Sequence, residues 1–252
     1  MKKGLVSVTF RKLEPEEIIQ LVKETGLDGI EWGSDIHVPV GNIEKAAHIA
    51  NLMQANGLET ISYGSYYRVG ESDNFQLIID TAKSLKTTNI RVWAGRKNHD
   101  QFTPLEKQAL INDAKRICEM AKEASMSISF EYHGKTYTNT HASTIDLLSE
   151  INMENNYSYW QPLSNASEKE KMENVKQLYQ DKKLMNIHIF HWDENNHPFL
   201  LSEGKELWAN RLKDINCNAL LIEFVKEDSI ENFYKDAQTL NELVIQHQNI
   251  NK

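Results

Sequence analysis

The hydrophobic positions of the chain alternate between two spacings. Short apolar, β-branched runs, typical of buried strands, are followed by longer segments with apolar residues at helical intervals. The predicted strands are residues 5–10, 29–32, 60–63, 90–94, 127–132, 157–160, 186–190 and 219–225. The predicted helices are residues 14–25, 42–56, 74–85, 103–124, 140–151, 167–180, 203–212 and 229–246. Helix boundaries carry their own signals, such as Thr103 with Pro104 and Glu106 at one start and Gly57 after one end.

Eight strands that alternate strictly with eight helices predict a single (β/α)₈ TIM barrel, one α/β domain spanning residues 1–252. A doubly wound sheet is the alternative, but it typically has fewer strands and often a glycine-rich phosphate turn. Neither GxGxxG nor GxxxxGK[ST] occurs in the sequence. No break in composition suggests a second domain.

Composition narrows the function classes. With 28 basic and 36 acidic residues the net charge is −8, which weighs against nucleic-acid binding as the main activity. Cys118 and Cys217 match no metal-binding spacing, and we expect them to be reduced thiols in a cytosolic protein. The N-terminal apolar run is too short for a signal peptide, and no run approaches the roughly 18 apolar residues of a membrane span. We therefore expect a cytoplasmic protein.

Three ionisable residues interrupt or end predicted barrel strands. They are Glu131 in SISFEYHG, His188 in MNIHIFHWD and Glu223 in ALLIEFV. A charged side chain in a barrel strand is costly unless it is paired or bound to a metal, and strand ends converge at the barrel mouth. Two carboxylates and an imidazole predict a site for Mn²⁺, Mg²⁺, Zn²⁺ or Co²⁺. The alternative is a hydrogen-bonded core histidine with two surface carboxylates.

Other polar and aromatic residues near the strand ends are candidate substrate contacts. Glu31 either serves the site or pairs inside the barrel with Arg91 or a lysine. His133 and His191 suit a contact role and a structural role about equally. The aromatic candidates Tyr63, Tyr66, Trp93 and Trp160 either form flat walls of a carbohydrate pocket or pack beneath the loops.

In order and spacing these segments resemble the xylose-isomerase-like barrel superfamily, which includes sugar-phosphate isomerases and epimerases, inosose dehydratase-type enzymes and endonuclease IV. The resemblance covers nearly the whole chain and is carried by GIEWGSDIHVP, ISYGSYYRVG, IRVWAG, SFEYHG, NIHIFHWD and LLIEF. It implies a divalent metal held by Glu131, His188, Glu223 and a residue of the sixth strand. The family's aspartate there is absent from YSYWQPLSN, which leaves the neutral Gln161, or Trp160, in its place. On the seventh strand His191 replaces the aspartate of the usual His-x-Lys-Asp motif.

The resemblance also implies an activity. We expect Glu131 and Glu223 to act as acid and base in an isomerase or epimerase that works through an enediolate, with His37 or His133 contacting substrate hydroxyls. The expected partner is a small carbohydrate, keto-sugar or sugar phosphate, and homo-oligomers occur among relatives. The alternatives are a dehydratase that expels a β-hydroxyl and a sugar-binding barrel that has lost catalysis. The net charge of −8 argues against an endonuclease IV-type nuclease.

Overall fold

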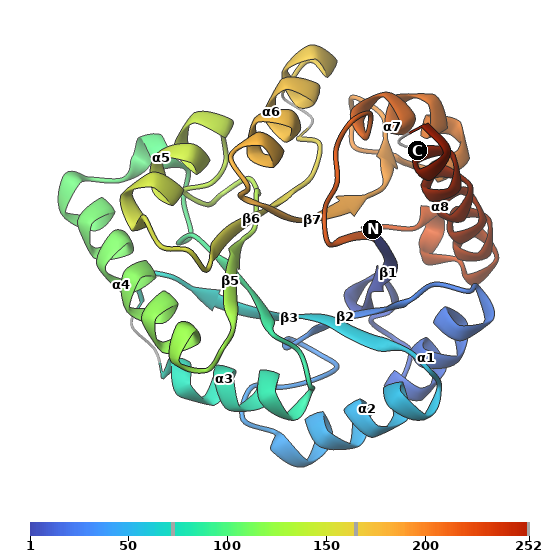
Figure 1. Ribbon diagram of the computed structural model, residues 1–252, viewed down its shortest axis with the longest axis horizontal. Coiled ribbons are helices and arrows are strands. Elements are labelled where there is room, and N and C mark those ends of the chain that lie inside the picture. The colour runs from blue at the N-terminus through green and yellow to red at the C-terminus, as the bar shows by residue number, and fades with distance from the viewer. Residues whose placement is uncertain (72–73, 164–165, 251–252) are drawn as a thin grey trace.

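The fold is a closed parallel barrel surrounded by helices, in a computed structural model that describes residues 1–71, 74–163 and 166–250 (Figure 1). The barrel strands are β1 (Lys2–Val6), β2 (Gly29–Gly33), β3 (Glu59–Arg68), β4 (Asn89–Trp93), β5 (Ser127–Phe130), β6 (Asn156–Trp160), β7 (Leu184–Ile189) and β10 (Ala219–Ile222). Their order is β1-β10-β7-β6-β5-β4-β3-β2, and β1 closes the ring by pairing with both β2 and β10. The predicted (β/α)₈ TIM barrel is confirmed.

A helix follows each barrel strand and packs on the outside of the ring (Figure 1). The helices are α1 (Pro15–Glu24), α2 (Ile43–Ala55), α3 (Phe75–Ser84), α4 (Pro104–Glu123), α5 (His141–Ile151), α6 (Glu168–Gln180), α7 (Lys205–Arg211) and α8 (Ile230–Ile250). Short 3₁₀ turns are η1 (Ser7–Phe10), η2 (His99–Gln101), η3 (Leu201–Gly204) and η4 (Lys226–Asp228).

Local sequence explains where these helices begin. At α4 the Thr103 hydroxyl accepts a hydrogen bond from the Glu106 backbone N–H (3.3 Å), and the Glu106 carboxylate accepts one from the Thr103 N–H (2.8 Å). This is the capping box that the sequence predicts, with Pro104 at the first helical position. Ser167 and Glu170 form the same motif at α6.

The first strand differs from its prediction. We expected a strand over residues 5–10, but β1 ends at Val6 and the chain turns into η1. The Ser7 hydroxyl accepts a hydrogen bond from the Gly33 backbone N–H (3.0 Å), which ties this turn to the end of β2. The apolar residues of the predicted strand are therefore divided between β1 and η1. The hydrophobic spacing alone did not reveal the boundary between these two elements.

Two further differences lie at the carboxyl ends of the strands. β3 continues beyond the predicted residues 60–63 to Arg68, and its pairing with β4 is irregular between Gly64 and Arg68. A two-stranded antiparallel sheet of β8 (His191–Trp192) and β9 (Pro198–Phe199) follows β7 and was not predicted. Two-residue strands are too short to produce a recognisable alternation.

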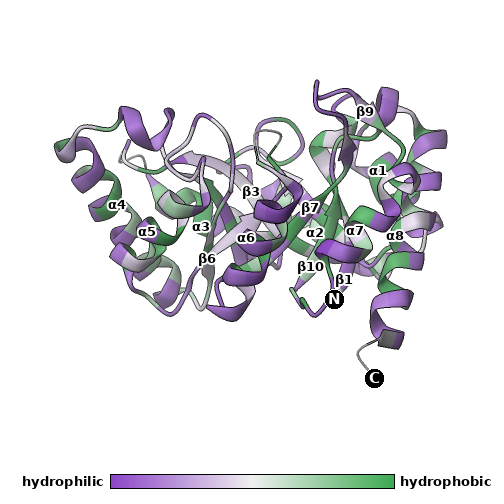
Figure 2. Cartoon of the chain, turned by 90° about the horizontal axis from the view of Figure 1, so that it is seen from above, coloured by the Kyte–Doolittle hydropathy of each residue, from purple (hydrophilic) through white to green (hydrophobic). Residues whose placement is uncertain are grey.

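The hydrophobic core lies between the barrel and its helices. Hydrophobic residues gather on the strands and on the helix faces turned toward them, while hydrophilic residues cover much of the outer helix surface (Figure 2). No helix in the described part of the chain is long and apolar enough to cross a membrane.

Two glycines allow the first strands to approach closely at the amino-terminal end of the barrel. Gly4 and Gly29 are register partners in β1 and β2. A Cβ added to Gly29 would lie 2.1 Å from the backbone oxygen of Glu59, and one added to Gly4 would lie 2.7 Å from the oxygen of Gly29. Because backbone atoms cannot move aside as a flexible side chain can, no larger residue fits either position without shifting a strand.

We therefore predict that Gly29→Ala destabilises the barrel. The expected loss in the free energy of unfolding is about 1–3 kcal/mol or more, because the added methyl group must displace backbone. Gly134→Ala is the control, since no atom lies within 4 Å of its added Cβ. Urea denaturation measures both variants, and an unchanged stability of Gly29→Ala would contradict the close approach.

Candidate metal centre

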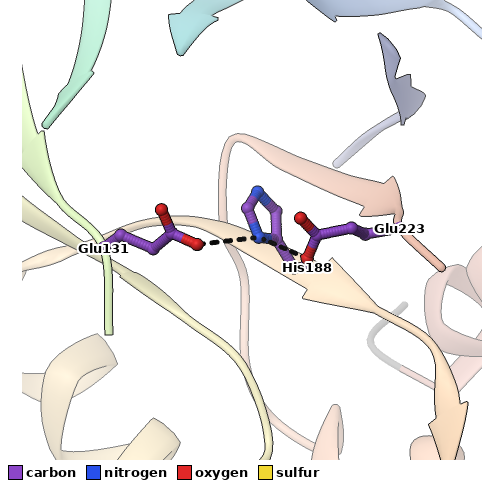
Figure 3. A group of neighbouring side chains, drawn as sticks. All are labelled: Glu131, His188 and Glu223. Atoms are coloured by element: carbon purple, nitrogen blue, oxygen red, sulfur yellow. Dashed lines mark ion pairs between the residues drawn. The ribbon is translucent and has the colours of Figure 1, made fainter. Parts of the chain in front are cut away.

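The structure brings Glu131, His188 and Glu223 together at the carboxyl ends of their strands (Figure 3). His188 lies in β7 and is the register partner of Leu221 in β10, so Glu223 follows two residues beyond. Glu131 directly follows β5. All three side chains are buried, and one ligand atom from each lies within 4.8 Å of the others. The three strand-end residues therefore lie together, as the sequence predicted.

His188 stands between the two carboxylates. Its Nδ1 is 3.0 Å from Glu223 Oε2 and 4.0 Å from Glu131 Oε1 (Figure 3). Despite this proximity, both ring nitrogens of His188 and Oε2 of Glu223 are buried without an aligned hydrogen-bond partner in the described residues. Buried polar atoms without partners are costly, and such groups in native proteins often coordinate an ion. Two carboxylates and an imidazole form a donor set that fits a divalent transition metal or Mg²⁺.

A buried ion pair lies directly beside this cluster. Arg91 of β4 donates from Nε to Glu31 Oε1 (2.7 Å) and from Nη1 to Glu131 Oε2. The Ser62 hydroxyl donates to the other oxygen of Glu31 (2.6 Å). Of the two roles left open for Glu31, pairing with Arg91 inside the barrel is the one observed. Glu31 is fully buried and is absent from the described lining of the mouth cavity, so we no longer assign it to substrate binding.

The charges of the cluster shift the pKa values of its members. Burial would raise the pKa of Glu31, but Arg91 and His188 outweigh burial and hold it below the usual range. Burial would lower the pKa of His188, whereas Glu223 and Glu31 raise it to about 10. The metal-free protein therefore carries an imidazolium at neutral pH, and Glu31 stays ionised.

Tyr159 packs against the His188 ring and is itself held by two asparagine side chains. The Tyr159 ring meets the His188 ring edge to face, with centroids 5.2 Å apart. The Tyr159 hydroxyl accepts a hydrogen bond from Asn186 (2.6 Å) and donates one to Asn89 (3.2 Å). These bonds fix the tyrosine ring, and the ring in turn limits the orientations open to the imidazole.

Above the cluster the barrel mouth forms a cavity of about 660 Å³, which includes Glu131 and Glu223 in its lining. Three predicted substrate contacts line it as well. Trp93 stacks on His133 with ring centroids 4.8 Å apart, and Tyr66 lies 5.6 Å from the same indole. These rings form an apolar wall of the cavity.

The loop after β1 adds residues that the sequence did not identify as site residues. Arg11 and Lys12 line the mouth cavity, as does Phe224 immediately after Glu223. Arg11 is held by an ion pair with Asp35. The sequence signal for these two residues is a basic pair directly after an apolar run. Because that run was predicted as a strand over residues 5–10, the loop that carries the pair was not recognised.

His37 and Tyr63 have structural partners instead. The His37 ring nitrogens lie 3.0 Å from the Ser7 hydroxyl and 3.2 Å from the Leu13 carbonyl oxygen. The Tyr63 hydroxyl donates to the Val38 carbonyl (2.8 Å). Neither residue is part of the described cavity lining, so their predicted substrate contacts are not supported.

Trp160, Gln161 and His191, at or after the ends of β6 and β7, lie in different surroundings. Trp160 is buried and packs edge to face on Trp208 of α7, with centroids 6.1 Å apart. His191 lines a separate cavity of about 690 Å³ beside α6 and α7. Gln161 is buried, and its amide nitrogen donates to the backbone oxygen of Tyr132 (2.9 Å), which leaves Oε1 as its acceptor atom.

Comparisons with known proteins agree with this architecture. A curated relative, the 3-dehydroshikimate dehydratase of Bacillus anthracis, is 30% identical over 166 residues, which cover 62% of this chain and 59% of that protein. The crystal structure of the probable 3-DHS dehydratase AsbF from Bacillus anthracis has a TM-score of 0.82 at 20% identity, covering 96% of this chain and 99% of that one. A D-psicose 3-epimerase structure has a TM-score of 0.75 at 15% identity, covering 96% and 97%. Residues 19–243 match the family described as "Xylose isomerase-like TIM barrel", and the chain belongs to that family.

Proposed function

We propose that this protein is a divalent-metal-dependent enzyme that removes a proton next to a carbonyl group of a small polyhydroxylated compound. The observation that carries the proposal is the buried cluster of Glu131, His188 and Glu223 beneath an open cavity. Both ring nitrogens of His188 and Oε2 of Glu223 lack an aligned hydrogen-bond partner in the described residues. A carbonyl compound of this kind fits a cavity with a charged floor and aromatic walls.

Glu131, His188 and Glu223 would hold the metal, with Gln161 as the candidate ligand from the sixth strand. Oε2 of Glu131 is bonded to Arg91, so Oε1 is the oxygen left for coordination. When bound, the ion supplies Lewis acidity that polarises the substrate carbonyl and makes the neighbouring C–H more acidic.

We further propose dehydration as the reaction. Glu223 takes the proton from the carbon next to the carbonyl, and the C–H electron pair forms a C=C bond as the β-hydroxyl departs. The same proton leaves with the hydroxyl as water, which regenerates the carboxylate. One base suffices for this sequence, and the similarity to a protein named as a 3-dehydroshikimate dehydratase supports it.

Epimerisation is the second candidate, and a different observation favours it. Glu131 and Glu223 lie on opposite sides of His188, so one carboxylate can remove a proton and the other can return it to the opposite face (Figure 3). Unlike dehydration, this reaction needs both carboxylates. The similarity to a D-psicose 3-epimerase structure is consistent with this arrangement of the fold.

We predict that the purified protein, supplied with Mn²⁺, converts 3-dehydroshikimate to a product that has lost one water. The reaction is followed by mass spectrometry and by the ultraviolet absorbance of the new conjugated double bond. D-psicose and D-fructose are tested in parallel. Conversion of the ketohexoses without turnover of 3-dehydroshikimate would replace dehydration by epimerisation as the proposed reaction.

Glu223→Gln should reduce turnover by about 10²–10⁴-fold, because the amide cannot accept the substrate proton. The fold should remain intact, as judged by circular dichroism and the melting temperature. Glu150→Gln, on the exposed surface of α5, is the control and should retain wild-type turnover. Full activity of Glu223→Gln would remove Glu223 as the base.

Metal binding should release a proton. Because the pKa of His188 is about 10 in the metal-free protein, an ion that coordinates its ring must displace the imidazolium proton. The apparent affinity for Mn²⁺ should rise between about pH 6 and about pH 9. Calorimetric titrations in two buffers with different ionisation enthalpies measure the released proton, and Mn²⁺ binding without proton release would contradict an imidazolium at His188 in the metal-free protein.

A further inference from the structure

In the buried Glu31–Arg91 pair, Arg91 lines the mouth cavity and Glu31 lies outside the described lining. The pair contacts two of the three residues that we assign to the metal. We propose that this pair positions the metal ligands: Arg91 leaves Glu131 a single free oxygen, and Glu31 orients the His188 ring from its far side. The inference rests on the proposed function, since it concerns residues that hold ligands in place. It assigns Glu31 a positioning role in place of the substrate contact that the sequence suggested.

Arg91 is fixed by its surroundings. Its side chain is almost completely buried and bonds to Glu31 and Glu131 at once. Gly64 of β3 is its register partner, and a Cβ at Gly64 would lie 2.7 Å from Arg91 Nη2 and 3.2 Å from Glu31 Oε1. The glycine therefore leaves the space that the guanidinium occupies. With Oε2 of Glu131 held by Arg91, only Oε1 faces the imidazole.

Glu31 faces the opposite nitrogen of His188. Nδ1 points toward Glu131 and Glu223, whereas Nε2 lies 3.7 Å from Glu31 Oε1. In metal sites a ligating imidazole commonly presents its second nitrogen to a carboxylate, which fixes the ring and its tautomer. Ser62, the register partner of Glu31, holds the other carboxylate oxygen, so Glu31 cannot rotate away without losing that bond.

The charges of this group match a divalent ion. Three carboxylates (Glu31, Glu131 and Glu223) and one guanidinium (Arg91) leave two negative charges when His188 is neutral. One divalent cation neutralises them. A carboxylate in place of Gln161 would add a further buried negative charge, so the neutral amide on the sixth strand is consistent with the Glu31–Arg91 pair already present.

The test compares Glu31→Gln with a matched buried carboxylate elsewhere. Asp113 of α4 is also buried and accepts hydrogen bonds from Tyr67 (2.9 Å) and the Gly70 backbone (2.8 Å), away from the described cavity lining. Both Glu31→Gln and Asp113→Asn should lower the melting temperature. Only Glu31→Gln should weaken Mn²⁺ binding, by about 10–100-fold in calorimetric titrations.

Two further measurements separate positioning from general stability. The visible absorption spectrum of the Co²⁺-loaded protein reports the geometry of the metal ligands. It should therefore change in Glu31→Gln and stay unchanged in Asp113→Asn. Ser62→Ala leaves the charges of Glu31 and Arg91 in place and should weaken Mn²⁺ binding by a smaller factor than Glu31→Gln. This variant provides the test if Glu31→Gln does not fold.

The outcomes are distinguishable. Wild-type affinity and an unchanged Co²⁺ spectrum in both Glu31→Gln and Ser62→Ala would overturn the positioning role and leave the proposed function standing. If Glu31→Gln does not fold, the result for Ser62→Ala alone decides. Failure of the wild-type protein to bind Mn²⁺ or Co²⁺ would overturn the proposed function, and this inference with it.

Discussion

The guanidinium of Arg91 inside the barrel is the constraint on which the site depends. A buried charge must be paired, and Arg91 obtains its partners from β2 and from the residue after β5, on either side of its own strand β4. Removal of one partner of such a pair typically costs about 3–5 kcal/mol, because the remaining charge stays buried. The interactions of Arg91 therefore link β2, β4 and the residue after β5 to one another.

From this constraint the chemistry of the mouth follows. Arg91 donates to one oxygen of Glu131, which leaves the other facing His188, and Glu223, directly after β10, faces the same ring. The aromatic wall of Trp93 and His133 covers one side of the space above. Oε2 of Glu223 has no aligned hydrogen-bond partner in the described residues, which leaves it available for the role proposed above.

The barrel could be predicted from the sequence because strand and helix periods alternate along the chain. Capping residues such as Thr103 also predict helix boundaries that the structure confirms. Glu131, His188 and Glu223 could be identified as candidate site residues because ionisable residues in apolar strands need partners, and a closed barrel brings their strands together. The sequence prediction misplaced His37, since loop paths decide where a loop side chain points. Strand position likewise did not reveal that Tyr63 turns its hydroxyl to Val38.

The central claim is that Glu131, His188 and Glu223 form a metal centre, and anomalous diffraction from crystals grown with Mn²⁺ tests it most directly. The account predicts one anomalous peak per chain, within coordination distance of Glu131 Oε1, a His188 ring nitrogen and a Glu223 oxygen. The electron density should also show whether Gln161 Oε1 completes the coordination. A peak elsewhere, or no peak in crystals that retain the imidazole between its two carboxylates, would contradict the account.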